Sequence, residues 1–208
     1  MAAGQSLKTA LKSGEREEST VETGQSFWQC RLSHLKTVLE KNGVEVFLAE
    51  DAAQARSVVL EQIIPQTGAR RISRGGSMTA LGAQLYDVLR EDPAVEFVEP
   101  FGEGLSPEAR LERLRQSLLV DLYITGTNAV TEAGQLVNLD MIGNRVGGIA
   151  FGPKYVVVLI GRNKIVPDLD AAMRRVRNYA APLNARRAAR GPAGALDRAG
   201  RSWSARAR

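Results

Sequence analysis

Apolar positions recur along this chain at two different spacings. Apolar side chains every three or four residues, or a capping residue at the start, predict helices over these segments: 27–41, 51–62, 78–89, 106–119 and 168–180. Short runs rich in apolar residues lie between them and predict strands over 44–48, 95–98, 122–125 and 155–160, and the short segment 70–73 is predicted as a further strand. The chain is therefore expected to alternate helix and strand.

This alternation favours βαβ units and a mostly parallel sheet with helices on both faces, an α/β fold of the Rossmann-like kind. The uninterrupted apolar run 155–160 predicts a central strand that is covered on both faces. Segments 135–139 and 145–150 lie on either side of a Gly-Asn turn signal and predict a β-hairpin near 135–150. Pro182 is expected to end the last helix.

The two ends of the chain differ from its body. Residues 1–24 are polar and are expected to be disordered, residues 25–186 to form one domain, and residues 187–208 to form a basic disordered tail. The net charge is +5, but residues 185–208 hold seven arginines and one aspartate, which leaves the rest of the chain at −1. Because the basic charge belongs to the tail, a nucleic-acid partner is not expected.

Composition excludes several further classes of protein. The 44% hydrophobic content is ordinary for a globular domain, and the absence of an apolar run long enough for a membrane span predicts no membrane association. Cys30 is the single cysteine, so no disulfide can form within the chain and a cytoplasmic location is expected. Cys30 and His34 share a helix but lack further ligands, so no metal site is expected. The same scarcity disfavours a catalytic triad.

The segment Arg74-Gly-Gly-Ser-Met-Thr79 joins a predicted strand to a predicted helix. Gly75 and Gly76 permit a tight turn with exposed N–H groups, Ser77 and Thr79 add hydroxyl groups, and a helix N-terminus would add partial positive charge. This combination predicts an anion-binding loop for a phosphate or carboxylate. The alternative is a plain strand-to-helix turn with Ser77 as its cap.

Polar side chains also gather where the strand 122–125 ends. They are Thr127, Asn128, Glu132, Asn138, Asp140 and Asn144. Because ligands bind at the carboxyl ends of strands in open α/β sheets, Glu132 is a candidate base or nucleophile and the others are candidate ligand-binding residues. The alternative is that asparagine, threonine and glycine serve here only as turn formers.

The strand 155–160 is followed by Asn163 and Lys164. Lys164 could pair with a substrate anion or keep Glu132 ionised. The alternative is a solvated lysine that pairs with Asp168 or Asp170. If the sheet is parallel, one pocket should be lined by the loops 75–79, 125–134 and 161–166, with Glu132 and Lys164 as its catalytic pair and Asn163 among its binding residues.

Several motifs, taken in order along the chain, resemble the LUD domain family, which includes the bacterial lactate-utilisation protein C. They are Gly-Gly-Ser-Met-Thr (75–79), Thr-Gly-Thr-Asn-Ala-Val-Thr-Glu-Ala-Gly (125–134), Asn-Leu-Asp (138–140), Gly-Asn-Arg-Val (143–146), Phe-Gly-Pro-Lys (151–154), Gly-Arg-Asn-Lys-Ile-Val (161–166) and Arg-Val-Arg-Asn-Tyr-Ala-Ala-Pro-Leu-Asn-Ala (175–185). The resemblance covers about residues 27–186. It implies a fold similar to the ribose-phosphate isomerase and CoA-transferase superfamily.

Two functional hypotheses follow from the resemblance. The first is an accessory or ligand-binding component of cytoplasmic L-lactate oxidation, with no cofactor in this chain and iron–sulfur clusters only in partner subunits. The alternative is a stand-alone enzyme, isomerase-like or CoA-transferase-like, that acts on a small anionic metabolite such as a carboxylate, a phosphate or a CoA ester, with Glu132 as base or nucleophile. The turn around Glu132 only loosely resembles the catalytic Glu-x-Gly of CoA transferases, and a fold does not transfer a mechanism. The cysteine-bearing segment with which similar family members often continue is missing here.

Overall fold

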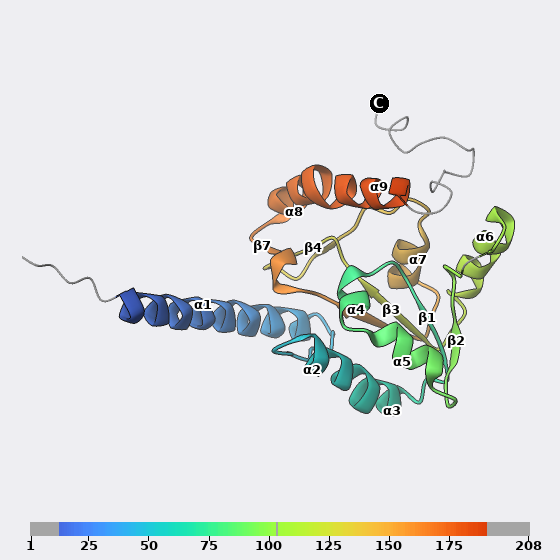
Figure 1. Cartoon of the computed structure of the whole chain (residues 1–208), viewed down its shortest axis with the longest axis horizontal. Helices are drawn as coiled ribbons and strands as arrows, with labels where there is room; N and C mark the ends of the chain where they lie inside the picture. The colour runs from blue at the N-terminus through green and yellow to red at the C-terminus, as the bar shows by residue number, and fades with distance from the viewer. Residues whose placement is uncertain (1–12, 103, 191–208) are drawn as a thin grey trace, which may run out of the picture.

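The structure is a computed structural model that describes residues 13–102 and 104–190 (Figure 1). The α-helices are α1 (Ser13–Lys41), α2 (Ala52–Ser57), α3 (Ile64–Thr67), α4 (Met78–Gly82), α5 (Leu85–Glu91), α6 (Pro107–Gln116), α7 (Asn144–Ala150), α8 (Leu169–Arg175) and α9 (Ala181–Arg190). The strands are β1 (Arg71–Arg74), β2 (Glu96–Val98), β3 (Leu122–Gly126), β4 (Ala129–Thr131), β5 (Leu136–Val137), β6 (Tyr155–Leu159) and β7 (Ile165–Val166). Two π-helical segments, η1 (Val58–Ile63) and η3 (Val176–Ala180), and a 3₁₀ turn, η2 (Arg162–Lys164), complete these elements. Among the described residues, no helix has both the length and the apolar character needed to cross a bilayer.

The main sheet is parallel, with the strand order β2-β1-β3-β6. Its middle strand β3 is buried along its whole length, as strands covered on both faces are. The expected parallel α/β architecture is therefore confirmed. The strand β6 is an edge strand rather than the central strand that its apolar run predicted, and Tyr155 at its start is 47% exposed.

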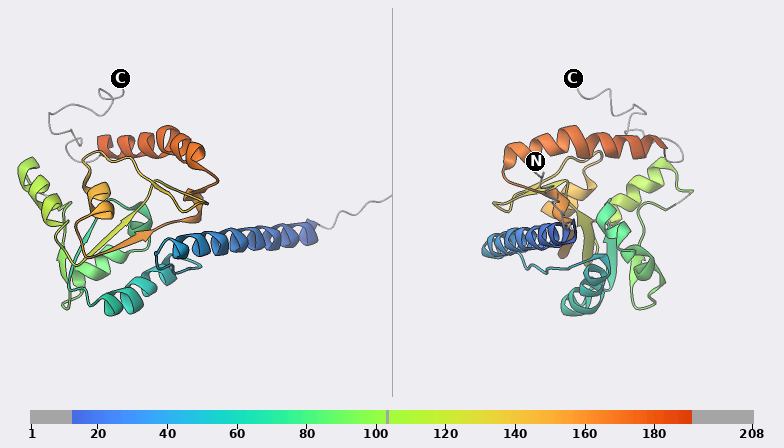
Figure 2. Two further views of the ribbon diagram at one scale, coloured as in Figure 1. Left: turned by 180° about the vertical axis from the view of Figure 1, so that it is seen from behind. Right: turned by 60° about the vertical axis from the view of Figure 1, so that its left-hand side comes forward.

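Helices cover both faces of this sheet (Figures 1 and 2). On one face, Ile72, Leu122 and Ile124 pack against Leu85 and Leu89 of α5 in the largest buried cluster. Tyr123, which alternates with these residues along β3, points to the other face and contacts Gly148 of α7. Because side chains alternate along β3, α5 packs on one face of the sheet and α7 packs on the other.

A second, smaller sheet has the order β5-β4-β7, with an antiparallel pair β4–β5 and a parallel pair β4–β7. Leu35 of α1 packs on Val130 and Ile165 of this sheet, so α1 covers it. The N-terminal part of α1 extends beyond the rest of the molecule (Figures 1 and 2). This helix begins at Ser13, so the expectation of disorder is wrong for residues 13–24, while residues 1–12 lie outside the described residues.

The expected hairpin near 135–150 is replaced by two elements. The antiparallel pair lies earlier in the chain, where Val130 faces Leu136. The segment predicted as its second strand is the helix α7, because the Asp140 carboxylate accepts hydrogen bonds from the backbone N–H groups of Arg145 (2.8 Å) and Val146 (3.1 Å) at the start of that helix. Because Asp140 lies several residues before the helix that it caps, the spacing of apolar residues in 145–150 did not reveal a helix start.

The predicted strand 44–48 is not present either. These residues lie in an extended connection between α1 and α2 without a β-ladder, and Val44 and Leu48 are exposed. The carbonyl oxygen of Val46 accepts a hydrogen bond from Lys36 Nζ at 2.7 Å instead of one from a neighbouring strand. The branched residues favour an extended backbone here, but no strand lies close enough to pair with it.

Pro182 does not end the last helix, which continues as α9 to Arg190. The π-helical segment η3 ends two residues before Pro182, just as η1 ends two residues before Pro65 of α3. A π-turn shifts the hydrogen-bond register, and in the first turn that follows it a proline, which has no N–H group, can be accommodated. Residues 187–190 of the expected disordered tail are therefore helical, and residues 191–208 lie outside the described part of the chain.

Candidate functional site

The candidate site lies where the strand order of the main sheet reverses. From β1 the chain proceeds to β2 on one side, and then to β3 on the other side of β1. The carboxyl ends of β1 and β3 lead into the loops that hold Gly75–Ser77 and Thr127–Asn128. Such a switch point is where open α/β sheets bind their ligands, so the topology places two of the three predicted loops at the expected position.

The glycine loop packs directly on the end of β3. A Cβ atom at Gly75 would lie 2.6 Å from Thr125 Oγ1, and one at Gly126 would lie 2.7 Å from Ser77 Oγ. Ser77 Oγ accepts the backbone N–H of Ala80 at 3.2 Å and so caps α4. Because α4 has only five residues, the partial positive charge at its N-terminus contributes little to binding the predicted anion.

The two glycines are expected to differ in their tolerance of alanine. Gly75→Ala should lower the free energy of unfolding by about 1 kcal/mol, because the new methyl group would displace the buried Thr125 side chain. Gly76 is exposed and has open space at its Cβ position, so Gly76→Ala should change stability by less than about 0.5 kcal/mol. Urea unfolding of both variants tests this, and an equal loss in both would refute a role for close packing.

Lys164 joins two of the predicted loops. Its Nζ donates a hydrogen bond to Thr79 Oγ1 at 3.1 Å, so the segments 75–79 and 161–166 do meet. Burial, followed by the positive charges of Arg175, Arg145 and Arg187, lowers the pKa of Lys164 to about 8. No ion pair joins this ammonium group to a carboxylate of the described residues. Neither Asp168 nor Asp170 is its partner, in contrast to the alternative that the sequence left open.

Glu132 is paired elsewhere. Its Oε1 lies 2.5 Å from Arg31 Nε of α1, and Arg31 also donates to the carbonyl oxygen of Ile165 at 3.4 Å. The backbone of Glu132 continues the β4–β7 ladder, where its N–H donates to Val166 O at 2.9 Å. The expected pairing of Glu132 with Lys164 is therefore wrong. Helix α1 packs on the small sheet next to Glu132, and its Arg31 forms the ion pair with the Glu132 carboxylate.

Three of the predicted binding residues after β3 hold their own loop together. Asn128 N–H donates to Asn138 Oδ1 at 3.2 Å, and Asn128 Oδ1 accepts from the N–H of Leu139 at 2.9 Å. Thr127 Oγ1 donates to Ala129 O at 2.8 Å and is buried. These contacts match the alternative reading of turn-forming residues, and they also fix the position of the Asn128 side chain beside the site.

Arg145 connects this loop to α7. Its Nη2 lies 2.9 Å from both Asn128 Oδ1 and Leu139 O, and 3.4 Å from Asp140 Oδ1. Asn144, the next predicted residue, donates from Nδ2 to the hydroxyl of Tyr123 at 3.3 Å. Burial raises the pKa of that hydroxyl, so it is neutral at physiological pH. Asp140 therefore positions Arg145, and Asn144 positions the Tyr123 hydroxyl. The Nε atom of buried Arg145 has no hydrogen-bond partner among the described atoms.

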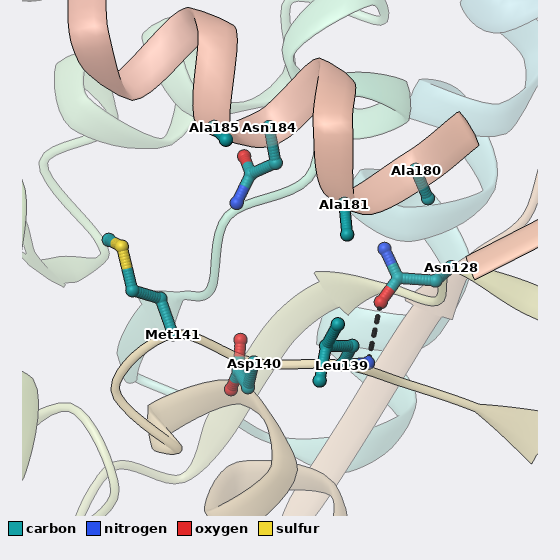
Figure 3. A pocket seen from close by; sticks show the side chains of 8 residues that line it. All are labelled: Asn128, Leu139, Asp140, Met141, Ala180, Ala181, Asn184 and Ala185. Carbon is teal, nitrogen blue, oxygen red and sulfur yellow. Dashed lines mark hydrogen bonds between the residues drawn. The ribbon is translucent and has the colours of Figure 1, made fainter. Parts of the chain in front are cut away.

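A small pocket opens between the loop 138–141 and the helix α9 (Figure 3). Its lining residues are Asn128, Leu139, Asp140, Met141, Ala180, Ala181, Asn184 and Ala185. The amide of Asn184 faces the loop from the helix side, across from Asn128 and Asp140. Asn128 therefore borders this pocket on one side and contacts Arg145 on the other.

Thr125 carries a buried hydroxyl group that has no hydrogen-bond partner among the described atoms. A buried unpaired hydroxyl costs about 1–3 kcal/mol. We therefore expect Thr125→Val, which preserves shape, to raise the free energy of unfolding by about 1 kcal/mol. Calorimetric melting of the variant tests this, and a fall in stability would show that the hydroxyl has a partner such as a buried water.

The sequence analysis missed the residues that the long last helix contributes. Asn184 and Arg187 were left out because Pro182 was expected to end the helix, whereas Arg175 lies within the predicted helix but was given no role in the site. Arg31, the partner of Glu132, was missed because its helix was predicted only as a core element. Asn163 is exposed, and its carbonyl oxygen accepts a hydrogen bond from Arg175 Nε at 3.3 Å. Cys30 is exposed as expected, and no cluster of metal-ligating side chains occurs in the described ranges.

Comparison with known families decides the relationship. The family model described as the LUD domain matches residues 32–196. The chain belongs to the LUD domain family. Among the curated proteins and the solved structures compared with it, none matches. The LUD domain match includes both sheets, the switch point with Lys164, and the helix α9 that borders the pocket.

Proposed function

We propose that this LUD domain protein binds a small organic carboxylate at the switch point and serves as a ligand-binding component of cytoplasmic L-lactate oxidation. The proposal rests on the surroundings of Lys164. This half-buried cation has no acidic partner among the described residues. The positive charges of Arg145, Arg175 and Arg187 also act on it. Asp140 offsets the charge of Arg145, but the positive charges together still disfavour the ammonium form of Lys164, and an anion that enters here would stabilise it.

The chemistry of these groups favours a carboxylate with a further oxygen atom. An arginine fork holds a carboxylate with two parallel hydrogen bonds. The Thr79 hydroxyl, 3.1 Å from Lys164 Nζ, can bond the hydroxyl or keto oxygen on the neighbouring carbon. L-lactate and pyruvate both have this pattern. Redox chemistry would then be supplied by iron–sulfur partner subunits, since this chain supplies binding and orientation.

The stand-alone enzyme with Glu132 as base or nucleophile is less well supported. The Glu132 carboxylate forms an ion pair with Arg31 of α1, whereas Lys164 forms a hydrogen bond with Thr79, so the two expected catalytic residues have different partners. We therefore expect Glu132→Gln to leave carboxylate binding unchanged.

Titration calorimetry of the purified protein tests the proposal directly. L-lactate and pyruvate should bind with one site per chain, inorganic phosphate more weakly, and lactamide, which has no charge, not at all. Glu132→Gln should give the same titration curves as the natural protein. Equal binding of lactamide and lactate would show that the arginine and lysine charges are not used, and would overturn the carboxylate site.

The assembly is tested separately. Tagged protein from lactate-grown cells should co-purify with iron–sulfur proteins, identified by their absorption spectrum and by mass spectrometry. Recovery of this chain without any iron-containing partner from such cells would contradict the accessory role.

A further inference from the structure

Lys164 differs from the other lysines of the described body in its surroundings. It is half-buried and bonded to a threonine hydroxyl, whereas Lys41 is exposed, Lys36 pairs with Glu40, and Lys154 is exposed and pairs with Asp121. Buried lysines normally pair with a carboxylate. The lack of such a partner here points to a lysine whose amine is available for chemistry in addition to its charge.

The charged groups that act on Lys164 come from three elements and are all positive: Arg145 of α7, Arg175 of α8 and Arg187 of α9. Thr79 of α4 contributes a neutral hydroxyl. With a pKa lowered to about 8, roughly a tenth of the Lys164 side chains are neutral at neutral pH, against fewer than one in a thousand for an ordinary lysine. Burial and neighbouring cations activate Schiff-base lysines in the same way.

We propose that Lys164 forms an imine with the keto carbon of a 2-oxo acid such as pyruvate, while the surrounding arginines hold the carboxylate. This inference rests on the proposed carboxylate site and adds covalent capture of the oxidised form of the ligand. L-lactate has no keto group, so the site would distinguish a 2-oxo acid from the 2-hydroxy acid by bond formation and not by shape.

The reaction is a condensation and needs no oxidant. The lone pair of neutral Nζ attacks the keto carbon, a C–N bond forms as the π bond of the keto group opens, and one Nζ proton passes to the former keto oxygen to give a carbinolamine. Nitrogen then expels the hydroxyl group, which leaves as water after taking up a second proton, and a protonated imine remains. The Thr79 hydroxyl is within hydrogen-bond distance of Nζ and can pass these protons.

Reductive trapping tests this proposal with the full-length protein. Pyruvate and sodium cyanoborohydride at neutral pH should add one N-carboxyethyl group per chain, and peptide mapping should find it on Lys164. Labelling should become faster as pH rises through about 8, the pKa of Lys164, while reversible binding of L-lactate weakens over the same range. Excess L-lactate should protect Lys164 from the label.

Two variants provide the matched controls. Lys164→Arg should remove the label while keeping the positive charge, and Lys154→Arg should leave the labelling unchanged. A label spread over exposed lysines, or none while calorimetry shows that pyruvate binds, would overturn the imine and leave the carboxylate site intact. The lack of both label and calorimetric binding would instead refute the carboxylate site itself.

Discussion

Replacing Lys164 with methionine is expected to weaken the binding of L-lactate at least about tenfold, because a charge-assisted hydrogen bond to a ligand contributes about 1.5–3 kcal/mol. Methionine keeps most of the side-chain volume, so the half-buried position should remain filled. Calorimetric titration of both proteins measures the loss. Lys154→Met is the matched control, and its binding should not change because Lys154 is exposed and pairs with Asp121.

The same variant has a characteristic effect on the pH dependence of stability. Between about pH 8, the pKa of Lys164 in the folded protein, and its higher value in the unfolded chain, the unfolded state binds more protons than the folded state. The contribution of Lys164 therefore makes the folded protein more stable as pH rises through this range. The stability of the natural protein minus that of Lys164→Met should increase accordingly, and a pH-independent difference would show that Lys164 titrates as an ordinary lysine.

Replacing Gly148 with alanine is expected to destabilise the fold by about 2–3 kcal/mol. The added Cβ would lie 2.6 Å from Cε1 and 2.8 Å from Cδ1 of the Tyr123 ring. Tyr123 is fully buried in β3, and a rigid ring held in a core has little room to move. For a domain of this size the change corresponds to a melting temperature lower by about 4–12 °C.

The neighbouring glycine of the same helix provides the control for this prediction. A Cβ at Gly147 would meet Leu118 Cδ1 at 3.7 Å, an ordinary contact. Gly147→Ala should therefore be neutral, or more stable by up to about 1 kcal/mol through higher helix propensity. Equal destabilisation by both changes would mean that α7 tolerates no side chain at either position for a reason other than the Tyr123 ring.

The sequence could predict the parallel sheet because strand segments alternate with helical segments along the chain, which is typical of βαβ units, although β1 has only one apolar residue, Ile72. The apolar run alone did not place β6, since such a run does not tell whether one or two strands pair with it. The loops 75–79 and 161–166 were expected to meet because the carboxyl ends of parallel strands lie at one sheet edge, and Lys164 does contact Thr79.

The position of Glu132 could not be predicted, for a different reason. Its partner Arg31 lies 101 residues earlier in the chain, and the helix that carries Arg31 was visible only as an apolar stripe. A local pattern shows that a residue is polar and follows a strand, but not which distant helix covers that strand. The contribution of α9 to the site was likewise hidden, because no local signal reveals that a π-turn will carry a helix past Pro182.

The packing of α1 on the small sheet has a consequence for where this domain can be cut. The family match begins at residue 32, within that helix, and so excludes Trp28 and Arg31. Trp28 adds to the apolar cluster around Leu35, and Arg31 neutralises Glu132. A shortened chain that began at the family boundary would expose apolar surface on β4 and β7 and leave a carboxylate without its cation. The practical N-terminal limit of an independently folding unit therefore lies at least one helical turn before the limit that the family model gives.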